Sequence, residues 1–184
     1  TPSNYMLRFN ANSYVEGRVY RRANAPTLPN VSVPNLPQRG SVNVGGNTIT
    51  LQGGDYSEIR MTNRNGVLRL GDPNSAEPIE YVFRDSTFNN GRVEILGPVK
   101  IYFTSAFSIK SGFSFGNENR PEDLQIFVTS GELDVQSGGL LSARLVAPNS
   151  GVTFRGNFRG TLVACYLNIY GNGVAFTLPP IITQ

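Results

Sequence analysis

The chain has 184 residues, about the size of one domain, and a formal net charge of +3 at pH 7. It contains no histidine and one cysteine, Cys165, so histidine-based triads, imidazole metal sites and intrachain disulfides are excluded. Its basic residues are 14 arginines and 2 lysines, so any cationic surface is mainly an arginine surface.

Charge is segregated along the chain. Residues 1–70 carry eight arginines and three acids, a net +5. Residues 71–138 carry five basic and ten acidic residues, a net −5, and residues 139–184 carry three arginines and no acid. Two basic ends therefore flank an acidic middle. This pattern suits a surface that faces a polyanion, although charges scattered over a solvated surface would give the same totals.

The N-terminal part differs from the rest of the chain. Residues 1–24 contain strand-like pieces, notably residues 14–20, and we expect them to form the first rungs of a β-fold. Residues 25–38 hold four prolines, which cannot donate to a ladder, and we expect an extended strap along the fold. Packed along the fold, such a strap would cover its apolar side chains, which are Leu28, Val31, Val33 and Leu36. The alternative, a flexible linker, would leave them exposed.

From residue 42 onward, short runs of β-branched and aromatic residues alternate with Gly, Asn, Ser and Asp, as strands bounded by turns do. No window keeps a helical period, and only residues 120–124 predict a single helical turn, with Pro121 near its start. We therefore predict an all-β chain. The predicted strands are residues 42–51, 67–70, 79–83, 93–96, 99–103, 107–109, 124–128, 133–135, 145–147, 152–154, 162–164 and 167–169.

These strands repeat. Apolar triplets start at Tyr81, Ile101, Ile126, Leu145 and Leu162, separated by 20, 25, 19 and 17 residues, and the polar insert at residues 116–123 accounts for the longest interval. A second short strand follows each of the last four triplets, and alternation places one set of its side chains inside and the other outside. The inward set is Phe107, Ile109, Leu133, Val135, Val152, Phe154, Leu167 and Ile169, and the outward set is Ser108, Asp134, Thr153 and Asn168.

Two or three short strands per repeat, with Gly/Asn corners and no helix, predict a single-stranded, right-handed β-solenoid, or β-helix. We expect one domain over residues 1–184, with the main solenoid at residues 39–178. We expect residues 179–184 to form an exit tail, because two prolines, Pro179 and Pro180, cannot donate to a ladder. A β-sandwich is the alternative fold, since it explains the alternation, but it does not explain the repeated triplets.

The order of the pieces resembles the β-solenoid module of bacterial type IV pilus-associated, minor-pilin-like surface proteins. The resemblance covers residues 14–176 and rests on the segments at residues 15–20, 49–51, 54–56, 97–102, 121–126, 145–149, 156–157 and 171–172, together with the Pro-rich strap. It implies an extracellular, pilus-associated location, pilin subunits or a parent surface protein as partners, and DNA binding at the pilus tip during natural transformation. The chain departs from the full-length pattern because it carries no pilin helix. No segment is long and apolar enough for membrane insertion.

DNA binding would use arginines, whose forked guanidinium binds phosphate in two places, and tyrosines, which stack on unpaired bases. Three groups of residues combine these types, although solvated strand-face arginines and core-edge tyrosines are the simpler interpretation. The first group is Arg18, Arg21 and Arg22 beside Tyr14 and Tyr20, the second is Arg60, Arg64 and Arg69, and the third is Arg155 and Arg159 followed by Tyr166 and Tyr170.

Other functions have less support. Two acidic groups could serve a solenoid hydrolase or lyase or hold calcium, but neither shows the paired spacing that glycoside cleavage needs, so we expect no enzyme activity and no cofactor. They are Asp72, Glu77, Glu80 and Asp85, and Glu118, Glu122 and Asp123. An adhesin or structural spacer that binds a surface or glycan is the main alternative to DNA binding. Ice binding through Thr48, Thr50, Thr104, Thr129 and Thr153, or a polymerising scaffold, is more remote. Cys165 is expected to be a small core residue.

Overall fold

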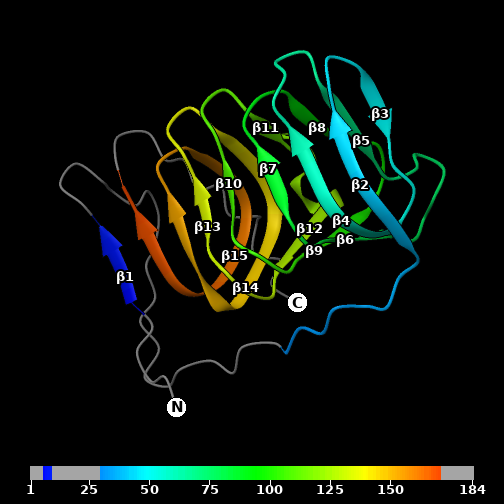
Figure 1. Cartoon of the computed structure of the whole chain (residues 1–184). Helices are drawn as coiled ribbons and strands as arrows, with labels where there is room; N and C mark the ends of the chain where they lie inside the picture. The colour runs from blue at the N-terminus through cyan, green and yellow to red at the C-terminus, as the bar shows by residue number, and fades with distance from the viewer. Residues whose placement is uncertain (1–5, 10–29, 171–184) are drawn as a thin grey trace.

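The structure is a computed structural model that describes Met6–Phe9 and residues 30–170 (Figure 1). Its regular structure consists of strands that all belong to one 15-stranded sheet, and every pairing between described strands is parallel. The described residues contain no α-helix, only the short 3-10 turn η1 (Pro121–Asp123). The all-β prediction is confirmed.

The strands form three stacks, which we call ladders A, B and C. Ladder A stacks the first half of β4 (Gly54–Met61), β6 (Ile79–Phe83), β9 (Val99–Phe103), β12 (Leu124–Val128), and the middle parts of β14 (Leu140–Phe154) and β15 (Asn157–Ile169). Ladder B stacks the second half of β4, β7 (Ser86–Phe88), β10 (Phe107–Ile109), β13 (Leu133–Val135), the ends of β14 and β15, and β1 (Met6–Phe9).

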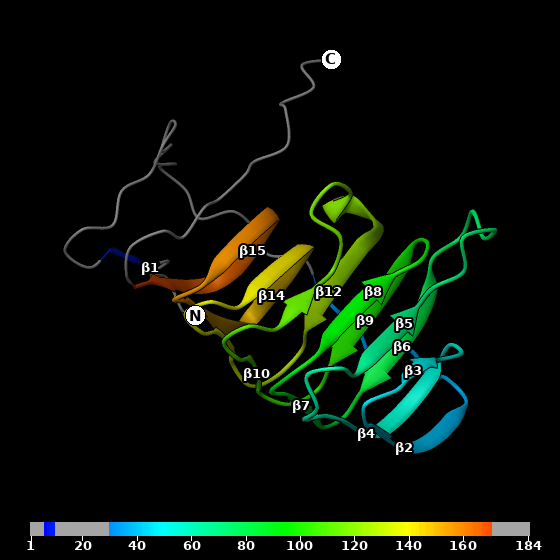
Figure 2. The same ribbon diagram turned by 90° about the horizontal axis from the view of Figure 1, so that it is seen from above.

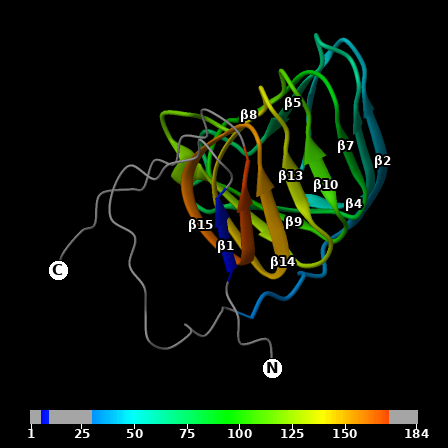
Figure 3. The ribbon, with the colours of Figure 1, turned by 90° about the vertical axis from the view of Figure 1, so that its left-hand side faces the viewer.

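Ladder C stacks β3 (Thr48–Thr50), β5 (Val67–Leu70), β8 (Arg92–Ile95), β11 (Ser114–Phe115) and the first residues of β14 and β15. Strand β2 (Gln38–Val44) pairs along β4. From β4 onward the chain visits the ladders in the repeated order A, B, C. Because β4 and β14 each pair with strands of more than one ladder, the hydrogen-bonded neighbours close a barrel-like ring of eight strands. Figure 3 shows the strands curving around a common interior.

The repeated triplets lie in register on ladder A. Tyr81 pairs with Ile101, Ile101 with Ile126, Ile126 with Leu145, and Leu145 with Leu162. The first four of these side chains are at most 1% exposed, so the first position of each triplet forms an inward column. The second strands lie equally in register on ladder B, with their predicted inward set buried or half-buried.

The centre of the core is aromatic. The ring of Phe88, on ladder B, lies 6.1 Å from that of Phe103 on ladder A and 5.2 Å from that of Phe115 on ladder C. Phe107 and Phe113 also contact Phe88, with ring centroids 6.3 and 5.4 Å away. All five rings are at most 4% exposed, so one phenylalanine joins the three ladders across the interior.

Some predicted elements differ from those observed. The single strand predicted at residues 42–51 is two strands, β2 and β3, because Gly45 and Gly46 turn the chain between ladders. Strands β4, β7 and β11 were not predicted, whereas the turn predicted at residues 120–124 is present as η1, inside the polar insert. An antiparallel β-sandwich is not what the described strands form, since all of them pair in parallel.

The N-terminal strand occupies an unexpected position. We predicted first rungs for residues 1–24, but the described part of that segment, β1, pairs in parallel with Tyr166–Ile169 of β15, at the opposite end of the sheet from β2 and β3 (Figures 1 and 2). The last strand of ladder B offers unpaired backbone groups, and β1 occupies them. Residues 30–37, the described part of the predicted strap, have no regular structure, with Val31 and Leu36 half-buried and Val33 exposed.

Candidate functional site

The turns that lead from ladder B to ladder C lie one above another, and we call this row the B–C corner. It consists of residues 45–47, 62–66, 89–91, 110–113, 136–139 and 155–156, all of which the structure describes. The row contains no aspartate or glutamate, whereas the turns from ladder C to ladder A hold five acids: Asp72, Glu77, Glu118, Glu122 and Asp123. The B–C corner is instead rich in Asn, Gln, Ser and Gly, and its cations are Arg64, Lys110 and Arg155.

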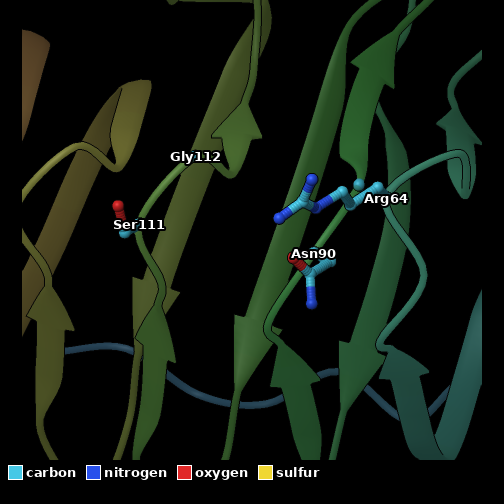
Figure 4. A pocket seen from close by; sticks show the side chains of 5 residues that line it. Arg64, Asn90, Ser111 and Gly112 are labelled. Carbon is cyan, nitrogen blue, oxygen red and sulfur yellow. The ribbon is translucent and has the colours of Figure 1, made fainter.

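An open pocket of about 380 Å³ lies on the B–C corner, lined by Arg64, Asn90, Gly91, Ser111 and Gly112 (Figure 4). These residues come from three successive turns. In Figure 4 the Arg64 side chain extends toward the turn that carries Ser111 and Gly112, and Asn90 lies beside its guanidinium. The volume falls within the range of small-molecule sites, so the pocket has room for one small polar group or sugar ring.

Glycines and asparagines fix the shape of these turns. Gly91 has φ +102°, and a Cβ there would lie 2.5 Å from the carbonyl oxygen of Gly66 in the turn before it, so only glycine fits this close approach. The Asn90 side-chain amide donates to the Thr62 carbonyl at 3.1 Å, which ties the same two turns together. The side-chain oxygen of Asn90 therefore stays available at the pocket.

Two cations of the B–C corner have no carboxylate partner among the described residues. Arg64 is exposed and Lys110 is half-buried, and neither belongs to any of the ion pairs. A guanidinium without a partner, in a row without acids, attracts anions and can donate two parallel hydrogen bonds to a carboxylate or a phosphate. The third cation, Arg155, is paired with Asp134 at 2.8 Å.

The other described arginines of the predicted DNA-binding groups are also neutralised. Arg60 pairs with Glu58 at 2.5 Å, and Arg69 pairs with Glu94 at 2.8 Å. Arg159 donates to the Glu118 backbone carbonyl at 3.2 Å and lies 3.7 Å from its carboxylate. Arg18, Arg21 and Arg22, with Tyr14 and Tyr20, lie outside the described residues. Of the predicted arginines that the structure describes, Arg64 alone has no acidic partner.

The two predicted tyrosines also interact within the fold. The Tyr166 hydroxyl donates a hydrogen bond to the Glu132 carboxylate, and this contact raises the pKa of Tyr166. The ring of Tyr170 lies beneath the Arg155 guanidinium, 5.4 Å from centroid to carbon, in a cation–π contact. The structure therefore does not bring the predicted residues together on one stripe: Arg69 is on ladder C, Tyr166 is on ladder B, and Arg64 is on the corner between them.

The acidic groups considered for catalysis are dispersed. Asp72 and Glu77 lie in the loop between β5 and β6, Asp85 follows β6, and Glu80 pairs with Lys100 at 3.4 Å. In the polar insert, Arg120 pairs with Asp123 at 2.9 Å. Within the described part of the chain, no group of three or more His, Cys, Asp or Glu side chains is placed to hold a metal ion.

Several remaining predictions concern single positions. The five threonines considered for ice binding do not form one rank, since Thr48 and Thr50 lie in β3, Thr153 lies in β14, and Thr104 and Thr129 lie after the ladder A strands. Cys165 is a free, half-buried thiol. A search of the described residues finds no helix with the length and apolarity needed to cross a bilayer.

Sequence reasoning named Arg64 but missed its neighbours in the pocket. Asn90 and Ser111 are 26 and 47 residues from Arg64 in sequence, and they line the same pocket only because successive B–C turns stack. The available signal was the absence of acids at every Gly/Asn turn that follows a ladder B strand. Comparisons with known proteins add nothing to this site, because no protein family, curated protein or solved structure matches the chain.

Proposed function

We propose that this chain is a non-catalytic recognition module, built as a β-solenoid and displayed outside the cell on a type IV pilus or pilus-like surface protein, which binds a polyanion at the B–C corner. The observation that carries the proposal is the acid-free row in which Arg64 and Lys110 have no carboxylate partner among the described residues. The surface location and the pilin partners come from the resemblance described above.

The solenoid interpretation is supported by the order in which the chain visits the three ladders. Each circuit through A, B and C adds one strand to each ladder, in parallel and in register, over Tyr81, Ile101, Ile126 and Leu145. A coil that advances by one strand spacing per circuit produces this pattern. The eight-strand ring then follows from β4 and β14, which continue around corners, so that β4 pairs with two ladders and β14 with all three.

DNA is the first polyanion to consider, since the resemblance implies it. Four of the arginines first considered for DNA binding are held by acids, namely Arg60, Arg69, Arg155 and Arg159. Breaking an exposed ion pair to reach a phosphate gains little, so at the B–C corner Arg64 and Lys110 would carry most of the electrostatic attraction. We therefore expect DNA binding, where it occurs, to show a shallow salt dependence, with a slope of about −1 to −2 in log affinity against log salt.

The test is a titration of fluorescently labelled duplex and single-stranded DNA over a salt series. Arg64→Ala is expected to weaken binding, whereas Arg155→Ala/Arg159→Ala should change it little, because those guanidiniums already bind Asp134 and Glu118. A triple variant, Arg18→Ala/Arg21→Ala/Arg22→Ala, tests the first predicted group. Unchanged affinity in Arg64→Ala together with loss in the triple variant would move the site away from the B–C corner.

A structural spacer or adhesin is the second candidate, and one observation favours it. Arg69–Glu94 joins outward residues of two successive ladder C strands, and Arg155–Asp134 joins the turn after β14 to the neighbouring strand β13, so both pairs stiffen the stack rather than expose charge. A spacer without a ligand site would bind no polyanion in the same titration. An adhesin would instead bind soluble glycans when these replace DNA in the titration.

A further inference from the structure

We infer that the ligand of the B–C corner is an acidic polysaccharide, whose carboxylates pair with Arg64 and Lys110 and whose hydroxyls bind the amide and hydroxyl groups of the same row. This inference rests on the proposed function, because it names the class of polyanion that the site takes. It is carried by three features of the corner: the sparse spacing of its free cations, the abundance of neutral polar groups, and the lack of an exposed aromatic ring.

The spacing of the cations suits a polymer of low charge density. Arg64 and Lys110 lie two turns apart, which is about 10 Å at the usual spacing of paired strands. Duplex DNA carries one negative charge per about 1.7 Å of its axis, so two cations would leave most phosphates along the six turns unmatched. A polymer of acidic sugars carries at most one carboxylate per ring, a much lower charge density than that of DNA, so two cations can match a larger share of its charges.

The neutral polar groups suit sugar hydroxyls, which both donate and accept hydrogen bonds. At the pocket, Asn90 keeps its side-chain oxygen as an acceptor, since its amide nitrogen is bonded to Thr62, and the Ser111 hydroxyl can do either. Further polar side chains continue the row on both sides of the pocket: Asn47, Asn63, Asn65, Gln136 and Ser137. A chain of sugars lying along the corner would meet such groups at each turn.

The shape of the site favours a polymer over a small molecule. The pocket of about 380 Å³ is open and has room for one ring, while the row of turns continues above and below it. A Cβ built on Gly112 would meet nothing within 4 Å, so the space beside this lining residue is not filled by other protein atoms. An extended chain can therefore place one acidic ring beside Arg64 and continue along the corner in both directions.

The lack of an exposed aromatic ring in the B–C corner argues against single-stranded nucleic acid as its ligand. Phe113 is the one aromatic residue within the described turns of the corner, and it is 1% exposed. The half-buried ring of Tyr170, which follows β15, is already occupied by its cation–π contact with Arg155. Proteins that bind single strands stack bases on exposed aromatic side chains. Phosphate contacts alone would have to hold the strand here, and the free cations are too few for that.

The experiment uses the full chain and measures binding by isothermal titration calorimetry to polygalacturonate, dextran, duplex DNA and single-stranded DNA. The test variant is Arg64→Ala. Its matched control is Arg144→Ala, which removes the same charge from another exposed arginine without an acidic partner in the described structure, on β14 of ladder A. We expect polygalacturonate to bind and dextran not to bind, with affinity at least about 10-fold weaker in Arg64→Ala and unchanged in Arg144→Ala. Circular dichroism confirms that both variants are folded.

The other outcomes separate this inference from the proposed function. If DNA binds in a way that depends on Arg64 and polygalacturonate does not bind, the inference of a polysaccharide ligand is wrong, but the proposed polyanion site at the B–C corner is retained. Equal affinities for dextran and polygalacturonate would show that the carboxylates do not contribute to binding and would refute their pairing with Arg64 and Lys110. Equal losses in Arg64→Ala and Arg144→Ala overturn the placement at the B–C corner, since the effect would then reflect net charge. Absence of binding to every polyanion overturns both proposals.

Discussion

The phenylalanine that joins the three ladders gives the sharpest test of the fold. Truncating Phe88 to alanine removes a ring that is 0% exposed and loses its contacts with Phe103, Phe107, Phe113 and Phe115. Replacing a fully buried phenylalanine by alanine costs about 3–5 kcal/mol, because the transfer free energy and the cavity add. With four aromatic neighbours facing the cavity, we expect the upper end of that range, a large share of the roughly 5–15 kcal/mol that stabilises a domain.

The matched control for this variant is Phe127→Ala. Phe127 is an outward residue of ladder A, half-buried, whose ring stacks on Tyr102 at 4.9 Å. We expect this change to cost about 1–2 kcal/mol, since only part of the ring leaves water on folding. Urea unfolding followed by circular dichroism and tyrosine fluorescence, in a chain without tryptophan, measures both values. Equal costs for Phe88→Ala and Phe127→Ala would refute the placement of the core.

Two further predictions concern the turns and the ion pairs. Gly91→Ala should lower the free energy of unfolding by more than the roughly 1–2 kcal/mol expected for Gly112→Ala. Both glycines have a positive φ, but only a Cβ at Gly91 would collide with the backbone. Chemical denaturation compares the two variants, and equal losses would argue against the close approach at Gly91. Hydrogen bonds from Arg69 and then from Arg92 lower the pKa of Glu94 below its ordinary value of 4.5. The stability that these ion pairs contribute is thus present above pH 4.5 and is lost as the pH falls through the lowered pKa of Glu94. Glu94→Gln should therefore lower the melting temperature at neutral pH and leave it unchanged in strong acid. An equal difference in melting temperature at both pH values would contradict the role of the Glu94 ion pairs.

Much of the fold could be predicted because large apolar side chains recur at regular intervals in the sequence. The triplets that begin at Tyr81, Ile101 and Ile126 each place a large apolar residue at the inward position of ladder A, so sequence spacing and structural register coincide. Ladder C could not be predicted as a stack. Its strands are short, β11 having two residues, and its outward positions carry Arg69 and Glu94 rather than a repeated residue type.

The candidate site was only partly predictable for a related reason. Whether an arginine is free or paired depends on which residue lies beside it in the next circuit, and the circuits differ in length. Arg155 reaches Asp134 over 21 residues, whereas Arg69 reaches Glu94 over 25 and Arg159 reaches Glu118 over 41. No fixed spacing identifies these pairs, so counting arginines along the sequence overestimates the free positive charge.

The parallel pairing of β1 with β15 has a mechanical consequence. A force applied upstream of Met6 and downstream of Ile169 pulls these two neighbouring strands in opposite directions along their own axes. Their four registered residue pairs, from Met6 beside Tyr166 to Phe9 beside Ile169, would then be sheared together rather than opened one at a time. Tension along the chain would thus fall first on this short clamp, while the rest of the stack stays unloaded until the clamp gives way.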